Sequence, residues 1–130
     1  MTESSTRGLQ AGKKKANKTD SVEFRRNHAV IIGIDKYSNG ISPLATAVND
    51  ARRLAQILEE QYDYSITLLI EEVTRARLQA LFQKELSGQI DANDRLLLYF
   101  AGHGVALDGE NGPEGYLNST GCNLIKGETK

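Results

Sequence analysis

The residues with the clearest chemical potential in this chain are Gly102-His103-Gly104. A neutral imidazole accepts and returns protons near working pH. The two glycines leave both sides of the histidine bare, so a substrate backbone can approach closely, and the Gly104 N–H can donate to a developing oxyanion. A base beside an oxyanion donor suits acyl transfer. A short triplet of this kind also occurs in plain strand-exit turns, so its context has to decide between the two interpretations.

The elements around this triplet follow a regular order. Residues 28–34, 65–70 and 95–101 are short apolar runs without polar alternation, which is typical of strands covered on both faces. Residues 43–62 and 75–86 carry apolar side chains at spacings of three and four, which predicts two helices. The order strand, helix, strand, helix, strand predicts an α/β fold with a parallel sheet.

In an open parallel sheet, ligands and catalytic groups gather at the carboxyl ends of the strands. His103 comes directly after the third predicted strand, so we expect the strand to present it at that edge. Residues 33–37 lie at the exit of the first strand, and Asn49-Asp50 lie in the first turns of the helix that follows. After Gly102 the chain is rich in glycine, and we expect a loop there.

Length and composition limit the classes of protein that remain. The chain has 130 residues, 39% of them hydrophobic and 25% charged, which suits one soluble domain with one core. It lacks an apolar run long enough to cross a bilayer and an apolar stretch typical of a secretory signal, so we expect a cytoplasmic protein without a membrane partner. Cys122 is the only cysteine, which excludes a disulfide framework or a cysteine-rich metal cluster.

Charge divides the chain into two parts. Residues 1–27 hold seven basic and three acidic residues, a net +4, and lack apolar periodicity, so we predict a disordered basic tail. A short basic cluster can serve as a nuclear address or touch nucleic acid, but a solvated tail is the favoured interpretation. Residues 28–130 carry a net −5, with nine basic and fourteen acidic residues, which argues against nucleic acid as a partner of the domain.

Three motifs together resemble the caspase-like cysteine peptidases, especially the metacaspase and bacterial caspase-like branch. They are residues 29–37, the Leu44-x5-Asp50 spacing with Asn49-Asp50-Ala51, and residues 97–104, in the family's order and on the expected elements. The resemblance runs from about residue 28 to residue 117. It implies a three-layer α/β/α fold with a mainly parallel sheet. It also implies a cysteine–histidine dyad that cuts peptide bonds, with a polypeptide substrate.

The resemblance assigns roles to individual residues. His103 matches the family histidine, and Gly104 matches the glycine whose N–H helps form the oxyanion hole. Asp50 matches an aspartate that in metacaspases lines the pocket for the side chain before the scissile bond, where an acidic wall favours Arg or Lys. Caspases proper carry an arginine where this chain has Leu44, so specificity for Asp is not expected. Alternatively, Asp50 is a helix-start carboxylate stabilised by the helix dipole.

The family's nucleophile has no match in this sequence. In caspases the cysteine follows the histidine by about 50 residues, whereas Cys122 follows His103 by 19 positions and no buried strand leads into it. For Cys122 we therefore favour an incidental thiol over the alternative, a catalytic nucleophile. The expected organisation is an incomplete caspase-like domain at 28–117 and an irregular tail at 118–130, truncated before the cysteine-bearing strand. An uncovered sheet edge would then make the chain marginally stable or prone to self-association.

Several functions remain open at this point. The first is a caspase-like endopeptidase, active only when a cysteine-bearing segment is supplied. The alternative is a catalytically inactive caspase-like interaction module or a truncated gene product. A receiver-like or flavodoxin-like domain is a weaker third hypothesis, because the first strand is followed neither by clustered acids nor by a Gly-x-Gly-x-x-Gly loop.

We expect no cofactor and no resident metal. His28 and His103 lie at opposite ends of different predicted strands, which gives little support to a metal ion shared between them. Asp108, Glu110 and Glu114 lack the spacing of a Ca²⁺ loop. Many metacaspases respond to Ca²⁺, so the resemblance allows Ca²⁺ activation, but no ligands can be matched here.

Overall fold

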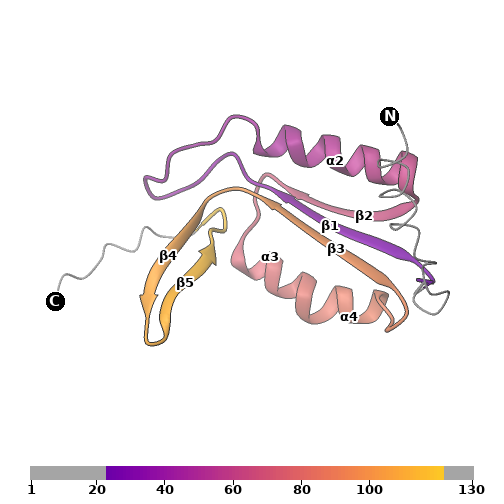
Figure 1. The fold of residues 1–130 in the computed structure, drawn as a ribbon. Coiled ribbons are helices and arrows are strands. Elements are labelled where there is room, and N and C mark those ends of the chain that lie inside the picture. The colour runs from indigo at the N-terminus through magenta and orange to yellow at the C-terminus, as the bar shows by residue number, and fades with distance from the viewer. Residues whose placement is uncertain (1–22, 122–130) are drawn as a thin grey trace, which may run out of the picture.

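A computed structural model describes residues 23–121 of the chain. A sheet lies between two helical layers, with α2 on one face and the helical segment from α3 to α4 on the other (Figure 1). The elements are β1 (Asn27–Gly33), α2 (Ala47–Tyr62), β2 (Tyr64–Ile70), α3 (Arg75–Ala80), the π-helical turn η1 (Leu81–Glu85), α4 (Leu86–Gln89), β3 (Arg95–Ala101), β4 (Gly104–Gly109) and β5 (Gly112–Leu117). The predicted three-layer α/β/α architecture is confirmed.

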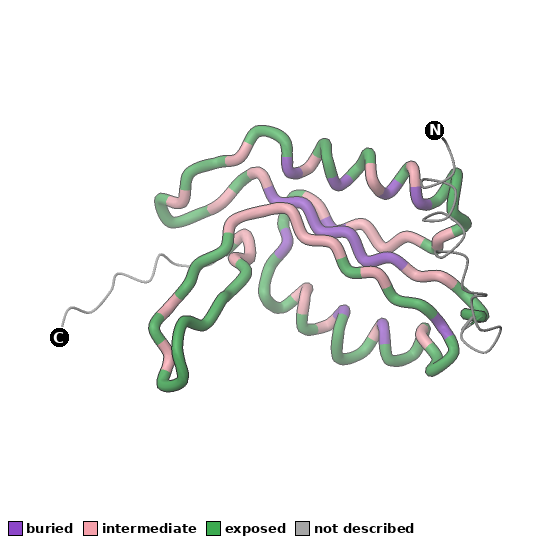
Figure 2. Tube along the Cα trace, in the orientation of Figure 1, coloured by how far each residue is buried: buried purple, intermediate pink, exposed green. Residues whose placement is uncertain are grey.

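The main sheet has three parallel strands in the order β2-β1-β3. β1 is central, and its residues from Ala29 to Gly33 are all buried (Figure 2). This agrees with its unbroken apolar sequence, since a strand covered on both faces has no solvent side for polar residues. β1 begins and ends one residue earlier than predicted, and β2 begins one residue earlier. β3 has the predicted bounds.

Alternate side chains of β1 build two separate cores. Val30 and Ile32 point toward the helical segment α3–α4, and Ala29 and Ile31 point toward α2. The first core is completed by Ile34, Leu69, Val73, Leu81 and Leu86. The second is completed by Ala51, Ala55 and Leu58, the apolar stripe of α2. The helical spacing in the sequence therefore identified the face of α2 that is buried.

Helix α2 starts four residues later than predicted. The segment before it is held by β1's exit loop, where the Leu44 N–H donates to the Asp35 carbonyl oxygen at 2.7 Å. The Asp35 carboxylate accepts from the Val48 N–H at 3.1 Å and so satisfies a donor that has no partner inside the helix. This capping group comes from a distant residue, which explains why a local pattern placed the start at residue 43 instead of Ala47.

The second helical segment runs past its predicted end. It continues from Arg75 through η1 and α4 to Gln89, so Gly88 lies inside it instead of breaking it. Thr74 caps its start by accepting from the Arg77 N–H at 3.1 Å. None of the described helices is long and apolar enough to span a membrane.

The prediction of a loop after Gly102 is wrong. β4 and β5 form an antiparallel hairpin in which Gly109 faces Gly112 across a two-residue turn. The two turn residues are Glu110 and Asn111, and Gly112 directly after them has a positive φ of 120°, which glycine adopts without steric cost. Pro113 is tolerated because β5 is an edge strand of a two-stranded sheet.

Ordered structure reaches past both predicted domain ends. At the start, the Arg25 N–H donates to the Asn93 carbonyl at 2.9 Å, and the Arg26 guanidinium contacts the Asp94 carboxylate at 2.9 Å. At the other end, the Thr120 hydroxyl accepts from the Val73 N–H at 2.8 Å. The remaining parts of the two predicted tails lie outside the described residues.

Candidate active site

His103 lies directly beyond β3, at the carboxyl edge of the main sheet. The loop between β1 and α2 leaves the same edge from the neighbouring strand (Figure 1). The histidine is partly exposed. The apolar third strand therefore presents the imidazole at the sheet's rim, as the sequence predicted.

The imidazole is held by a backbone carbonyl of the β1–α2 loop. Its Nε2 lies 2.8 Å from the Ser42 carbonyl oxygen. A carbonyl oxygen only accepts, so we assign the hydrogen of the neutral ring to Nε2. Nδ1 then carries the lone pair. The geometry selects one ring nitrogen of His103 as the basic one.

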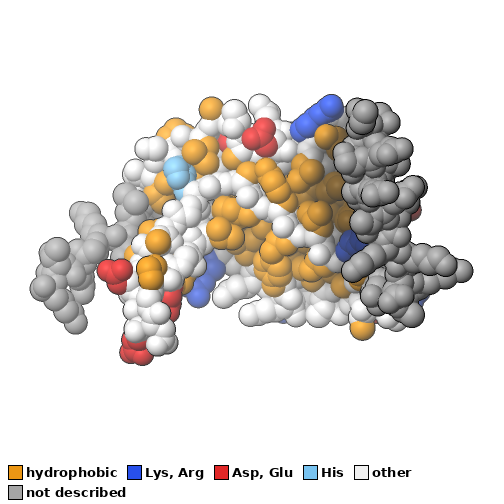
Figure 3. Space-filling view, viewed as in Figure 1, with side chains coloured by type: hydrophobic (Ala, Val, Ile, Leu, Met, Phe, Trp, Pro, Cys, Tyr) orange, Lys and Arg blue, Asp and Glu red, His pale blue; other side chains and the backbone are white. Residues whose placement is uncertain are grey.

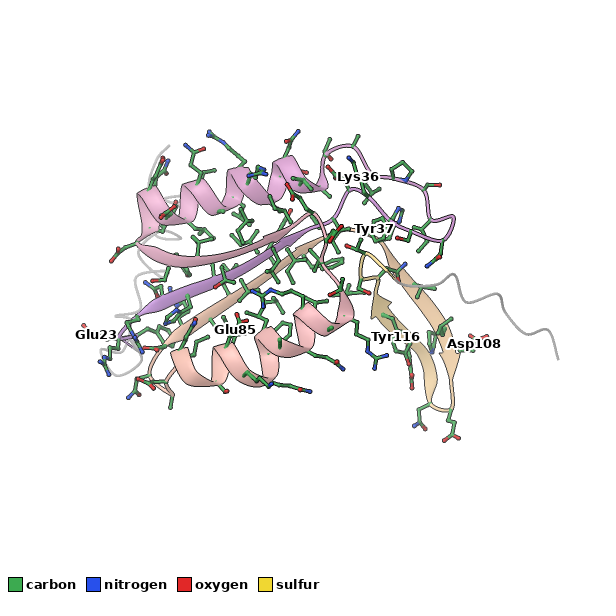
Figure 4. All side chains as sticks on the ribbon, turned by 180° about the vertical axis from the view of Figure 1, so that it is seen from behind. Glu23, Lys36, Tyr37, Glu85, Asp108 and Tyr116 are labelled. Carbon is green, nitrogen blue, oxygen red and sulfur yellow. The ribbon has the colours of Figure 1, made fainter. Side chains whose placement is uncertain are left out.

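Tyr37, on the same loop, makes two contacts with His103. Its hydroxyl oxygen accepts from the His103 backbone N–H at 2.7 Å. The two rings also meet edge to face, with centroids 4.9 Å apart and planes at 65°. Figure 4 shows Tyr37 at the end of the sheet from which β4 departs. Backbone and ring of the histidine are thus both fixed by one side chain.

Gly104 begins β4 and faces Leu117 across the hairpin. One residue earlier, the His103 carbonyl accepts from the Asn118 N–H at 2.9 Å. Hydrogen-bonded and non-hydrogen-bonded pairs alternate along an antiparallel ladder, so the Gly104–Leu117 pair is of the second kind. The Gly104 N–H is therefore directed away from β5.

Asp50 occupies the first turn of α2, at the same edge of the molecule. It is exposed, and its carboxylate forms no ion pair within residues 23–121. Its backbone N–H donates to the Thr46 carbonyl at 2.8 Å. The structure therefore brings His103 and Gly104 together but shows no direct contact between Asp50 and either of them.

A cavity of about 510 Å³ is lined in part by Tyr37. Three acidic residues, Asp35, Glu71 and Glu72, and one basic residue, Lys36, also line it. None of the three predicted site residues is among its lining residues. In the described part of the chain, no group of three or more His, Cys, Asp or Glu side chains is arranged to hold a metal ion.

Comparison with known proteins places this chain in a family. The family model of the caspase domain matches residues 26–126. The chain belongs to the caspase-domain family. This caspase domain is also 33% identical over 95 residues to Metacaspase-4 of Arabidopsis thaliana. That match covers 66% of the chain and 22% of the relative's length, so the chain spans about a fifth of that protein.

The structure adds contacts around His103 that the sequence left unassigned. Ser42 contacts the imidazole through its backbone carbonyl, and a backbone carbonyl has no sequence signature. Tyr37 lay within a segment that the sequence placed at this edge, but a side chain's partner depends on the path of the loop. Asp35, from the same segment, caps α2. Cys122 lies outside the described residues.

Proposed function

We propose that this caspase domain supplies the histidine half of a cysteine endopeptidase site. The observation that carries the proposal is the pairing of His103 Nε2 with the Ser42 carbonyl at 2.8 Å. That bond leaves Nδ1 as the nitrogen that takes a proton. The family match supports the reaction class, and residue-level roles in this chain are our proposal.

In the proposed reaction, Nδ1 of His103 removes the proton of a cysteine thiol. The thiolate attacks the scissile carbonyl carbon, and the carbonyl oxygen becomes an oxyanion that accepts from the Gly104 N–H. The imidazolium then gives its proton to the leaving amine as the C–N bond breaks. Water, deprotonated by Nδ1, attacks the acyl-enzyme, and the thiol leaves as the carboxylic acid forms.

The nucleophile is proposed to come from a strand that adds to β3. Among the described residues β3 is an edge strand, paired on one side with β1. A parallel neighbour on its other side would end at the same carboxyl edge as His103. Cys122 is the only cysteine in this sequence, and no described strand carries it. A cysteine positioned by a strand would gain the proximity that a dyad requires.

Asp50 is proposed to favour Arg or Lys before the scissile bond. It is exposed at the edge where substrate would bind, and its carboxylate has no ion-pair partner among residues 23–121. An unpaired carboxylate attracts a cationic side chain and repels an acidic one. If Asp50 only stabilises the start of α2 through the helix dipole, it would occupy the same position but would not affect which side chain is preferred before the scissile bond.

Fragment complementation tests the proposed function. The chain is mixed with a synthetic segment that carries a cysteine at the end of an apolar strand, then assayed on fluorogenic peptides ending in Arg, Lys or Asp. We expect cleavage after Arg and Lys only when both parts are present, and loss of cleavage in His103→Ala. Asp50→Asn should reduce the preference for Arg and Lys. Absence of cleavage, with folding and binding of the segment demonstrated, would overturn the proposal.

A second candidate is an inactive module that occupies the partner surface of an active relative. The exposed leucines of β3 favour it, since Leu96 and Leu98 remain 44% and 53% exposed. Such a module should inhibit the active relative in a dose-dependent way, with His103→Ala inhibiting as well as the natural chain. Inhibition that requires His103, or no inhibition at any concentration, would argue against this role.

A further inference from the structure

We propose that Tyr37 is a positioning residue for His103, an inference that rests on the proposed function. Tyr37 itself would not touch substrate. It would set where the imidazole stands and which way Nδ1 points, through the two contacts described above. The loop from residue 34 to residue 46 would thus hold the histidine at two points, by Tyr37 and by the Ser42 carbonyl.

The first contact gives an acceptor to the His103 backbone N–H, which lies outside both strands. β3 ends at Ala101, whose carbonyl accepts from the Ile34 N–H at 3.0 Å. His103 lies between β3 and β4, outside both strands. Its N–H donates to the Tyr37 hydroxyl at 2.7 Å. A partly buried N–H without an acceptor is costly, so the hydroxyl stabilises this turn in the conformation that presents the histidine.

The second contact limits rotation of the ring. The edge-to-face packing at 4.9 Å blocks one side of the imidazole, while the Ser42 carbonyl fixes Nε2. The histidine side chain has two rotatable bonds, and the two restraints act on different parts of its ring. Loss of Tyr37 would therefore broaden the range of ring orientations even with the Ser42 contact retained.

Gly102 gives independent support for the position of the Tyr37 hydroxyl. A β-carbon built at Gly102 would overlap the Tyr37 hydroxyl oxygen, and it would stand 2.9 Å from Cζ of Phe100. The absence of a side chain at Gly102 therefore makes room for the hydroxyl against the strand end. Gly102 therefore leaves space for the Tyr37 hydroxyl, in addition to leaving His103 accessible to substrate.

Tyr37 also packs against the core cluster of Val30, Ile32 and Ile34. A purely structural role would lower stability and change nothing specific at His103. A positioning role changes the accessibility and orientation of the imidazole while the domain stays folded. The experiment must therefore report on the histidine ring itself.

Chemical modification of the two histidines gives that readout without any peptidase activity. Diethyl pyrocarbonate modifies accessible imidazole nitrogens, and mass spectrometry separates His103 from His28, whose Nε2 is buried. Tyr37→Phe removes the hydroxyl and keeps the ring, and Tyr37→Leu removes both contacts. Tyr99→Phe is the matched control, because Tyr99 packs in the other core, against α2.

We expect the modification rate of His103 to rise about fivefold in Tyr37→Phe, the factor for losing one neutral hydrogen bond, and further in Tyr37→Leu. Tyr99→Phe should match the natural chain, and His28 should be unchanged in every variant that folds. Unchanged His103 reactivity in folded Tyr37→Phe would overturn the proposal, as would a parallel rise at His28. Because this readout needs no nucleophile, its failure is separable from a failure to cleave peptides.

Discussion

Gly33 and Ala51 lie so close together that no side chain fits between them. A β-carbon at Gly33 would stand 2.6 Å from the Ala51 Cβ and 2.7 Å from the Ala47 carbonyl oxygen. The first turns of α2 therefore rest directly on the end of β1. The same turns carry Asp50 and follow the loop that contacts His103. The contact between Gly33 and Ala51 therefore fixes the position of α2 and of this loop's end relative to β1.

Substituting Gly33 should disturb this contact. We expect Gly33→Ala to lower the free energy of unfolding by about 1–3 kcal/mol, the usual cost of overpacking a core. Urea unfolding followed by circular dichroism measures the change. Gly88→Ala is the control, because Gly88 has open space around it and lies in a helix, where alanine adds about 0.5–1 kcal/mol of stability. Equal destabilisation by both variants would contradict the packing argument.

A second structural feature lies at the opposite end of the sheet. The Asp94 side chain is fully buried. The Asp91 backbone N–H donates to it at 2.9 Å, which lowers its pKa below the usual value, and the Arg26 guanidinium at 2.9 Å acts in the same direction. The carboxylate joins the chain before β1 to the turn before β3.

This pKa makes stability depend on pH in a defined direction. A carboxyl whose folded pKa is lowered stabilises the fold above its unfolded pKa, about 3.9, and that contribution disappears as pH falls through the folded value. The unfolding midpoint should therefore drop in acid. Asp94→Asn should be less stable than the natural chain at pH 7 and show a flatter acid profile. Asp108→Asn, an exposed carboxylate on the hairpin, should keep the natural slope; a natural slope in Asp94→Asn would refute the assignment.

The sequence predicted the parts of the fold that depend on local pattern. Unbroken apolar runs identified β1 and β3, and the stripe of α2 identified its buried face. The start of α2 was missed because its cap, Asp35, arrives from another element. The hairpin was missed because its glycines and Pro113 suggested a loop, and its turn residues, Glu110 and Asn111, are not one of the pairs that mark a two-residue hairpin turn.

The site was predictable in part for the same reason. A buried strand before His103 was enough to place it at the sheet edge. The Ser42 carbonyl could not be found, since every residue carries one and only the loop's path selects it. Tyr37 was placed near the site, but its contact with His103 depends on the three-dimensional course of both segments.

Thr120 provides a test of how the end of the described chain is attached. Its hydroxyl accepts from the Val73 N–H at 2.8 Å and donates to the Glu71 carbonyl at 3.2 Å, and its own carbonyl accepts from the Ser38 N–H at 3.1 Å. These bonds join it to the loops after β1 and β2.

Thr120→Val keeps the shape of the side chain and removes both hydroxyl bonds. We expect a loss of about 1–3 kcal/mol, because two hydrogen bonds of about 0.5–1.5 kcal/mol each are removed. The Val73 N–H keeps the Glu71 carbonyl as a second acceptor at 2.9 Å. Hydrogen exchange at Val73 should accelerate. Thr120→Ser retains the hydroxyl and should stay within about 1 kcal/mol of the natural chain. If Thr120→Ser loses as much as Thr120→Val, the hydroxyl is not the stabilising group.

Within residues 23–121, β3 pairs with β1 on one side and with no strand on the other, and this open edge supports the last prediction. Hydrophobic side chains gather over this part of the molecule (Figure 3). An apolar pocket of about 160 Å³ beside it is lined in part by Leu98, Phe82, Phe100 and Leu117. An edge strand with unpaired backbone groups and exposed leucines favours pairing with another strand.

We therefore expect the chain to self-associate reversibly, which sedimentation velocity over a range of concentrations measures. Leu98→Lys should weaken the association by roughly tenfold or more, because a two-fold symmetric pairing at the middle of β3 brings both new charges together. Tyr62→Lys adds the same charge at the end of α2, at a residue that is 60% exposed. If both variants weaken association equally, net charge is responsible and β3 is not the contact surface.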